Sequence, residues 1–440
     1  MNRVTRLLLC GVVVASCTAE PGGGGVNIAT STMLPPVPGP STTLAPTTTS
    51  STAPRSTTTT VPVLVVDGSV ERSSGVPVAG ATIAIGDQQV SSGPDGSFSL
   101  ETTDPGAISV TKLGWTTAQV PWEEWTGDHI VTIDQATIRG LRVSPAAAAD
   151  DVHFSSLLTL ADGTAVNALV FDTKREGGEV VYDTDVIAAR DSGAVNAIYD
   201  PAARVGQAHA LGLYTITRIV TFEDSRRVGA FPDEKLAGAW LDPVSAGARE
   251  YNLALAEEAC ELGFDEIQFD YVRYPTGQTA TISGQLDLTQ EERVAAIAGF
   301  LSEARHRLEP KGCSVSAAIF GIVTSSPTDQ GLGQRPEELS AETHVLSPMV
   351  YPSHYSPGWL GLDDPNSHPY EVTSGAIADA LARMTGHSQL RPWLQGFWWS
   401  NEQIRRSIDA AEDLGVGWIL WNIRSNYDLA ALPTDEEVGG

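Results

Sequence analysis

Residues 261–275, which read ELGFDEIQFDYVRYP, contain the pattern that decides the fold. A helical stretch ends at Leu262-Gly263, as helices often end at glycine, and a β-rich run follows over 265–272. Apolar or aromatic residues occupy every second position of this run, and between them stand Glu266, Gln268 and Asp270. Because successive side chains of a strand point to opposite faces, one face is apolar and the other polar. The pattern predicts a strand whose apolar face packs against helices. Its polar face, with Glu266, Gln268 and Asp270, then lines the interior of the fold.

The same order of strand and helix repeats from residue 136 to residue 433. The predicted strands are eight: 137–143, 165–171, 212–220, 265–272, 313–320, 345–351, 390–397 and 417–421. The clearest predicted helices are 246–262, 289–308, 374–385 and 401–414, and Thr289 with Glu292 forms a capping-box pattern. Eight such units in about 300 residues predict an α/β fold, the (βα)8 TIM barrel. The competitor is a doubly wound open sheet, but no glycine-rich phosphate fingerprint opens any helix.

A smaller β-rich module is predicted over 63–135. Short apolar runs at 63–66, 82–85, 97–100, 108–112 and 129–133 are separated by turns rich in Gly, Pro or Asp, which favours an all-β sandwich. The segments VDGSV (66–70), VPVAGATI (76–83) and PDGSF (94–98) resemble those of the carboxypeptidase regulatory-like β-sandwich family. The resemblance implies an accessory domain. Its Trp115, Trp122 and Trp125 suit either sugar stacking or packing.

The first 62 residues are predicted to be an export signal and a tether. Residues 1–16 have a basic start and a short apolar run, and small residues precede Cys17. This ending resembles the bacterial lipobox, which implies that Cys17 is lipidated and holds the chain at the outer face of the cytoplasmic membrane or cell envelope. Ordinary secretion is the alternative. Residues 17–62 are rich in Ser, Thr, Pro and Gly and predict a disordered linker.

Composition limits the partners. The 440 residues include 54 acidic and 27 basic side chains, a formal charge of -27, which argues against nucleic acid and against an anionic membrane surface. We expect a monomer that contacts membrane only through Cys17. The eight His residues show no paired ligand spacing, so we predict no metal and no cofactor. Cys260 precedes the fourth predicted strand and Cys313 begins the fifth, so the two can form a disulfide outside the cytoplasm; two buried free thiols are the alternative.

The chemistry is expected where the strands end, because TIM-barrel active sites lie at the C-terminal ends of the strands. Asp270 is the first candidate catalytic carboxylate, and an ion pair with Arg273 is its structural alternative. Asp172 ends the second strand and is the second candidate, unless it only pairs with a nearby cation. Asp224 follows the third strand as a further candidate or a helix cap. Glu223, beside Asp224, is a weaker candidate for the catalytic carboxylate.

Seven segments of the barrel carry a family resemblance. They are residues 261–275 and NALVFDTK (167–174), YTITRIV (214–220), WLDP (240–243), SPMVYPSHY (347–355), RPWLQ (391–395) and WN (421–422). Together they resemble a bacterial glycoside hydrolase family with a (βα)8 barrel. The fourth strand is also similar to that of chitinase-like barrels, whose acidic series ends in a glutamic acid. That position holds Val272 here, and an earlier acidic position holds Gln268.

Side chains beside the carboxylates are predicted to bind substrate. Arg218 and Arg273 could hold carboxylates or acidic sugars. Aromatic rings near the mouth, the end of the barrel where the strands finish, could stack on a pyranose. The predicted binding residues are Arg218, Arg273, Tyr351, His354, Tyr355, Trp398, Trp421 and Asn422.

The sequence therefore predicts an envelope-anchored glycoside hydrolase that cleaves an extracellular or cell-wall polysaccharide. Asp270 and Asp172 form the expected carboxylate pair, with Asp224 in reserve. The alternative is a non-catalytic carbohydrate-binding or scaffold lipoprotein on a degenerate barrel, because the chitinase-type glutamic acid is missing.

Overall fold

The computed structural model describes residues 63–103, 106–125 and 129–438. The predicted export signal, Cys17 and the linker lie outside the described residues. Among the described residues, no helix combines the length and the apolar character that crossing a membrane requires.

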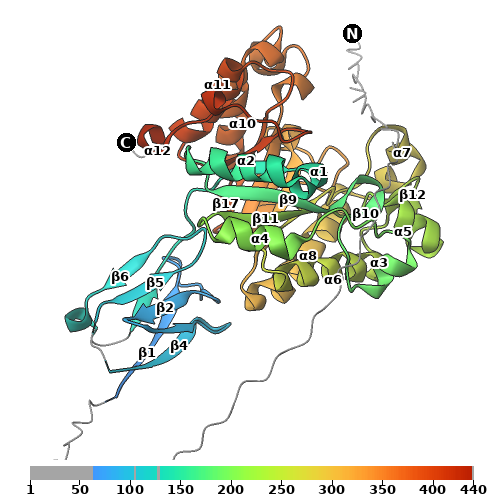
Figure 1. The fold of residues 1–440 in the computed structure, drawn as a ribbon. Helices are drawn as coiled ribbons and strands as arrows, with labels where there is room; N and C mark the ends of the chain where they lie inside the picture. The colour runs from blue at the N-terminus through green and yellow to red at the C-terminus, as the bar shows by residue number, and fades with distance from the viewer. Residues whose placement is uncertain (1–62, 104–105, 126–128, 439–440) are drawn as a thin grey trace, which may run out of the picture. The chain divides into compact units, whose positions relative to one another are not determined.

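Eight parallel strands close into a barrel, as the sequence predicts (Figure 1). In barrel order they are β8 (Arg139–Val143), β9 (Ala168–Arg175), β11 (Tyr214–Val220), β14 (Glu266–Asp270), β15 (Ser314–Phe320), β16 (Val345–Val350), β18 (Trp393–Gln395) and β19 (Trp418–Trp421). The ring closes because β8 pairs with both β19 and β9. Short strands accompany it: β10 (Glu179–Val180), β12 (Lys235–Ala237), β13 (Trp240–Leu241) and β17 (Gln389–Leu390).

The seventh predicted strand is shorter than the sequence pattern suggests. A single strand was expected over 390–397, but the structure divides it into β17 and β18 around Arg391 and Pro392. Proline has no backbone N–H to donate to a neighbouring strand, which explains the break. The carbonyl of Pro392 still accepts from the amide of Ile419 at 2.9 Å, so the barrel remains continuous there.

Helices alternate with the strands. They are α1 (Pro145–Ala149), α2 (Asp151–Asp162), α3 (Ile187–Asp191), α4 (Pro201–His209), α5 (Ser225–Ala230), α6 (Ala246–Glu261), α7 (Gly277–Ile282), α8 (Gln290–Leu308), α9 (Pro336–Glu342), α10 (Pro369–Arg383), α11 (Asn401–Asp413) and α12 (Asp435–Val438). The capping box that Thr289 and Glu292 predict is present at the start of α8. The long predicted helices are thereby confirmed, although α10 begins five residues earlier than expected because Pro369 suits its first turn.

The strand side chains divide into two layers, as their alternation requires. On β14, Ile267 and Phe269 join the large apolar cluster that packs under the helices, and Phe269 meets Phe300 of α8 at 5.0 Å between ring centroids. Glu266 and Gln268 face the interior, where both have partners from across the barrel. Arg391 donates to Glu266, and Gln268 bonds to Ser347 of β16 and Trp393 of β18. The interior of this barrel therefore combines paired polar groups such as Glu266 and Gln268 with apolar side chains such as Val170, Ile216 and Ile419.

The N-terminal module consists of two small sheets that share one apolar core. One contains β1 (Leu64–Glu71), β4 (Ser97–Thr102) and β7 (Ile130–Thr132); the other contains β2 (Thr82–Ile85), β3 (Gln88–Ser91), β5 (Ile108–Thr111) and β6 (Ala118–Val120). The sequence pattern did not predict β3 or β6. Both are sheet-edge strands with no buried residue, so neither carries the apolar alternation that marks a strand.

Cys260, near the end of α6, and Cys313, just before β15, form a disulfide with a Cα–Cα distance of 6.1 Å. The bond joins the N-terminal ends of two neighbouring barrel units, away from the end where the strands finish. It closes a loop with a sequence separation of 53 residues.

Removing this cross-link should destabilise the protein. Closing a loop of this length restricts the unfolded chain, so the double change Cys260→Ser and Cys313→Ser should cost about 2–4 kcal/mol of unfolding free energy. Guanidinium unfolding of the oxidised proteins measures it. A reductant should lower the wild-type midpoint and leave that of the double variant unchanged; equal midpoints for the two oxidised proteins would contradict the prediction.

Candidate functional site

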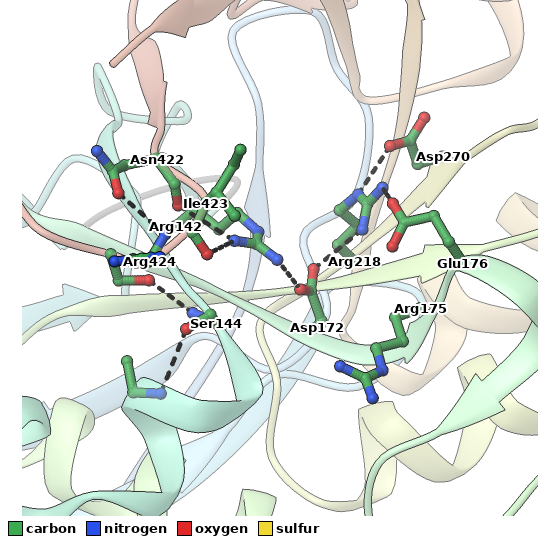
Figure 2. Close-up of polar contacts among 12 residues, drawn as sticks. Arg142, Ser144, Asp172, Arg175, Glu176, Arg218, Asp270, Asn422, Ile423 and Arg424 are labelled. Carbon is green, nitrogen blue, oxygen red and sulfur yellow. Dashed lines mark hydrogen bonds and ion pairs between the residues drawn. The ribbon is translucent and has the colours of Figure 1, made fainter. Parts of the chain in front are cut away.

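A buried arginine at the C-terminal end of the barrel contacts three carboxylates (Figure 2). Arg218 of β11 donates from Nε to Oδ2 of Asp270 at 2.7 Å, and from Nη1 to Oδ1 of Asp172 at 3.2 Å. Its Nη2 donates to Oε1 of Glu176 at 2.6 Å. Only 1% of its side chain is exposed. Burial opposes the charged guanidinium, but Glu176, Asp270 and Asp172 together raise the pKa of Arg218 well above its usual value.

The register of β11 with β9 and β14 explains why these side chains lie together. Arg218 lies opposite Asp172 on β9 and opposite Gln268 on β14, two residues before Asp270. Side chains at alternate positions of parallel strands share the barrel interior. The residues that the sequence places at the ends of the second and fourth strands are thus brought together by the third.

Asp270 is the last residue of β14, and its carboxylate is fixed at both oxygens. Oδ2 accepts from Arg218, and Oδ1 accepts from the backbone amide of Tyr271 at 2.7 Å. Tyr271 has a φ of 49°, an uncommon conformation for a bulky residue. Such backbone outliers concentrate at functional sites, where the surrounding structure holds them in place. The alternative partner considered for Asp270, Arg273, instead lies against the rings of Trp240 and Phe320.

Asp172 is more enclosed. Its side chain has 0% exposure, and it lies between two guanidinium groups, because Arg142 of β8 donates to Oδ2 at 2.5 Å while Arg218 contacts Oδ1. The indole of Trp421 covers both arginines, at 4.2 Å from Arg142 and 4.9 Å from Arg218. Two charge-assisted hydrogen bonds in a buried setting hold the carboxylate in one position.

An irregularity in β9 separates two further charges from this cluster. The register between β9 and β11 shifts after the Asp172–Arg218 pair, and such a bulge redirects the side chains that follow. Lys174 turns toward α6, where it contacts Asn252 at 3.0 Å and pairs with Asp224 at 2.8 Å. Asp224 is fully buried and caps α5 by accepting from the amide of Arg227. The structure therefore places Asp224 in the helix layer, apart from Asp270 and Asp172.

Aromatic residues surround the mouth on the side of β16 and β18. Tyr351 is buried; burial, and next the charge of Asp270, raise its pKa well above the usual value. Its ring lies 5.4 Å from that of His354 and 5.5 Å from that of Phe397. Partial burial lowers the pKa of His354. Trp398 has a positive φ of 61° and 82% exposure, so its indole faces solvent beside Phe397.

Three other predicted binding residues serve the loops. Tyr355 packs on Trp359 at 5.2 Å, and burial raises its pKa. Asn422 donates to the carbonyl of Gly396 at 2.6 Å and accepts from backbone amides of its own turn. Arg273 donates to the carbonyl of Tyr274, and burial lowers its pKa to about 10 despite the nearby charge of Asp270. These contacts order the loops that carry the mouth.

Two site residues escaped the sequence analysis. Arg142 lies within a predicted strand. Its position between the helix-facing residues Leu141 and Val143 indicates that its charged side chain faces the barrel interior. Glu176 follows β9 in a short 3-10 turn, Glu176–Gly178, and its signal was a carboxylate just beyond a strand end. The bulge in β9 hid it, because simple alternation does not predict where a side chain points after a bulge.

No group of three or more His, Cys, Asp or Glu residues suited to a metal ion occurs in the part of the chain that the structure describes. Cations in the candidate site are supplied by arginines.

Comparison with known proteins places this barrel in a family. The profile of DUF4015, described as "Putative glycosyl hydrolase domain", matches residues 140–427. No curated protein matches the chain.

Several solved structures are similar to the chain. A hypothetical protein from Ruminiclostridium thermocellum is 29% identical, with 40% of this chain and 96% of that chain covered and a TM-score of 0.35. The PgaB (BpsB) glycoside hydrolase domain from Bordetella bronchiseptica is 13% identical, with 66% and 95% covered and a TM-score of 0.49. A chitinase from Chromobacterium violaceum is 13% identical, with 67% and 97% covered and a TM-score of 0.42.

Removing the guanidinium should destabilise the protein strongly. Arg218→Met leaves the buried Asp270 without its cation and Asp172 with Arg142 alone, which should cost about 3–5 kcal/mol of unfolding free energy at neutral pH. Chemical unfolding measures the cost, with the exposed Arg424→Met as the matched control. A loss below about 1 kcal/mol would show that the cluster does not depend on Arg218.

Lowering the pH should reduce the difference in unfolding free energy between wild type and Arg218→Met. Partial burial opposes ionisation of Glu176, whose side chain is still 47% exposed, but Arg218 lowers its pKa to about 2. A depressed carboxyl pKa contributes stability above its unfolded value, near 4.3, and that stability is lost as pH falls toward about 2. The gap between wild type and Arg218→Met should therefore narrow below about pH 4.3, as unfolding at stepped pH measures. A gap that stays constant to about pH 2 would contradict this.

Proposed function

Because the chain belongs to the glycosyl hydrolase domain family matched over residues 140–427, we propose that its barrel hydrolyses glycosidic bonds of an extracellular or cell-wall polysaccharide. The observation that carries the proposal is the Asp270 carboxylate. It lies at the C-terminal end of a barrel strand, where such barrels have their active sites, and its orientation is fixed by Arg218 and the amide of Tyr271.

Glycosidic hydrolysis uses two carboxyl groups, one protonated and one ionised. Asp270 suits the ionised role of nucleophile or base, since Arg218 stabilises its negative charge. Asp172, the partner expected from the sequence, has both oxygens engaged by arginines and no exposed surface. In the proposal Asp172 therefore positions Arg218, and Arg218 in turn positions Asp270. Asp224 holds Lys174 and the start of α5.

Trp398 is the proposed sugar platform. An indole with 82% exposure stands in the loop after β18, on the aromatic side of the mouth. An exposed ring of this size costs solubility unless a ligand covers it, and the flat face of a pyranose suits an indole. We include Tyr351, His354 and Trp421 among the groups that line the site, because their rings surround the same strand ends.

Export is part of the proposal. The disulfide between Cys260 and Cys313 supports it, because such bonds persist in oxidising compartments and are rare in the cytosol. The signal-like residues 1–16 and the lipobox-like ending at Cys17 agree with this location. We propose a lipid anchor at Cys17, a linker over 17–62 and an accessory β module over 63–135, ahead of the barrel.

A second candidate function is carbohydrate binding without cleavage. It is favoured by Val272, which stands where chitinase-like barrels have their acid and is fully buried. A barrel that lost its proton donor would retain the aromatic platform and bind glycan as a scaffold lipoprotein.

Turnover on a panel of bacterial and plant polysaccharides separates the two functions. Wild type should release reducing ends from at least one glycan, and Asp270→Asn should lower that rate by about 10²-fold or more, because the neutral amide cannot serve as nucleophile or base. Reducing-end assays measure the rate, and the exposed Asp162→Asn on the opposite side of the barrel is the matched control. Unchanged turnover in Asp270→Asn would refute its role, and glycan binding with no turnover in wild type would favour the scaffold.

Trp398→Ala should weaken substrate binding. Losing one aromatic stacking contact of about 0.5–1.5 kcal/mol should raise KM roughly 2- to 10-fold and leave kcat nearly unchanged. Steady-state kinetics on the cleaved glycan measure both constants. Trp398→Tyr keeps a ring and should recover most of the affinity, whereas an unaltered KM in the alanine variant would remove Trp398 from the site.

A further inference from the structure

The proposed hydrolysis needs a proton donor, and the nearby carboxyl groups differ in their freedom to supply one. Asp172 is enclosed by two arginines, and Asp224 is enclosed beside Lys174. Glu176 pairs with Arg218, which holds its pKa at about 2, so it is ionised at neutral pH. Each of these three carboxyl groups is already engaged in an ion pair.

Glu223 lies beside Asp270 along the backbone. Beyond the end of β11, the amide of Thr221 donates to the carbonyl of Asp270 at 2.8 Å, and the amide of Phe222 donates to that of Tyr271 at 3.3 Å. Glu223 then forms a bridge to Trp240 of β13. The chain at Glu223 is thus held between the end of β14 and β13.

The side chain of Glu223 makes its hydrogen bond outside the helix layer, at the amide of Gly177. Its two neighbours both enter that layer: Phe222 packs on Phe300 of α8, and Asp224 pairs with Lys174. The carboxyl of Glu223 instead reaches the turn Glu176–Gly178, from which Glu176 contacts Arg218. Both Asp270 and Glu223 act on Arg273, because the negative charge of each favours its protonated form. The two carboxyl groups therefore belong to one electrostatic environment.

One oxygen of Glu223 is fixed and the other is free for chemistry. Oε2 accepts from the amide of Gly177 at 2.6 Å, in the same short turn that carries Glu176. Oε1 accepts no hydrogen bond from any residue in the described ranges, and no arginine or lysine forms an ion pair with this carboxyl there. The half-buried side chain is thus oriented by a neutral donor.

We propose that Glu223 is the general acid of the reaction and acts with Asp270. This assignment rests on the proposed function. The proton on Oε1 of Glu223 passes to the glycosidic oxygen as the bond from that oxygen to C1 breaks, and the leaving sugar departs as an alcohol. Asp270 either bonds to C1 or removes a proton from the water that attacks C1. In the first case, water then displaces Asp270 while Glu223 takes back a proton.

The surroundings of Glu223 suit this role. Burial raises its pKa, and the negative charges of Glu176 and Asp224 add to the effect, against the amide of Gly177 and the charge of Lys174. Arg273, after β14, is the other charged group in its environment. A glutamic acid with a raised pKa keeps its proton closer to neutral pH, as a general acid must.

A leaving-group comparison tests the assignment. The substrates are the oligosaccharide that wild type cleaves fastest and the dinitrophenyl glycoside of its terminal sugar. Glu223→Gln should lower kcat on the oligosaccharide by about 10²–10⁴-fold and affect the dinitrophenyl glycoside far less, because dinitrophenolate leaves without a proton. The decline of wild-type rate at rising pH should also disappear in this variant. Glu402→Gln, exposed on α11, is the matched control, and thermal unfolding checks that each variant folds.

The outcomes distinguish this assignment from the proposed function. If Glu223→Gln keeps full activity on both substrates, or loses it equally on both while remaining folded, Glu223 is not the acid, although Asp270→Asn still abolishes turnover. If wild type cleaves no glycan in the panel, the proposed function fails and the assignment fails with it.

Discussion

The contact of Arg218 with three carboxylates is the interaction on which the rest of the site depends. A guanidinium inside a barrel is costly to desolvate, and only well-placed partners offset that cost. Asp172, Glu176 and Asp270 provide them from the ends of β9 and β14, on either side of Arg218. The planar fork of arginine can bind several carboxylates in fixed directions, which a lysine cannot do. The arrangement makes the orientation of Asp270 a property of the barrel itself.

Local irregularities complete the site around this contact. The bulge in β9 turns Lys174 outward and allows Glu176 to reach Arg218, while the positive φ of Tyr271 brings its amide onto Asp270. Each departs from regular strand geometry at the end of the barrel where chemistry is expected. Regular strands build the scaffold, and the deviations at their ends direct the charged side chains.

The fold could be predicted from the sequence because its signals are local and repeated. Alternation in 265–272 gave the correct layers, with Ile267 outward and Gln268 inward, and the Thr289 capping box marked the start of α8. The division of the seventh strand depends on Pro392, whose missing N–H interrupts the pairing within the predicted strand 390–397. Edge strands such as β3 carried no apolar pattern to detect.

The site was less predictable, because it depends on pairing between distant segments. Asp270 stood out through its position at a strand end, but nothing in the sequence showed that Asp172 would be enclosed by Arg142 and Arg218. Asp224 and Glu223 are neighbours in the chain, yet Asp224 pairs with Lys174 while Glu223 accepts from the amide of Gly177, which only the folded structure reveals. Burial and ion pairing, which distinguish a catalytic carboxyl from a structural one, are properties of the folded chain.

Hydrolysis of a glycosidic bond at Asp270 is tested most directly by isotope incorporation during cleavage. Wild type is incubated with the polysaccharide panel in water enriched in oxygen-18, and the products are analysed by mass spectrometry. We expect new reducing ends that carry one heavy oxygen at C1, formed by wild type and not by Asp270→Asn. Products without the label, or equal labelled products from the two proteins, would contradict hydrolysis at Asp270.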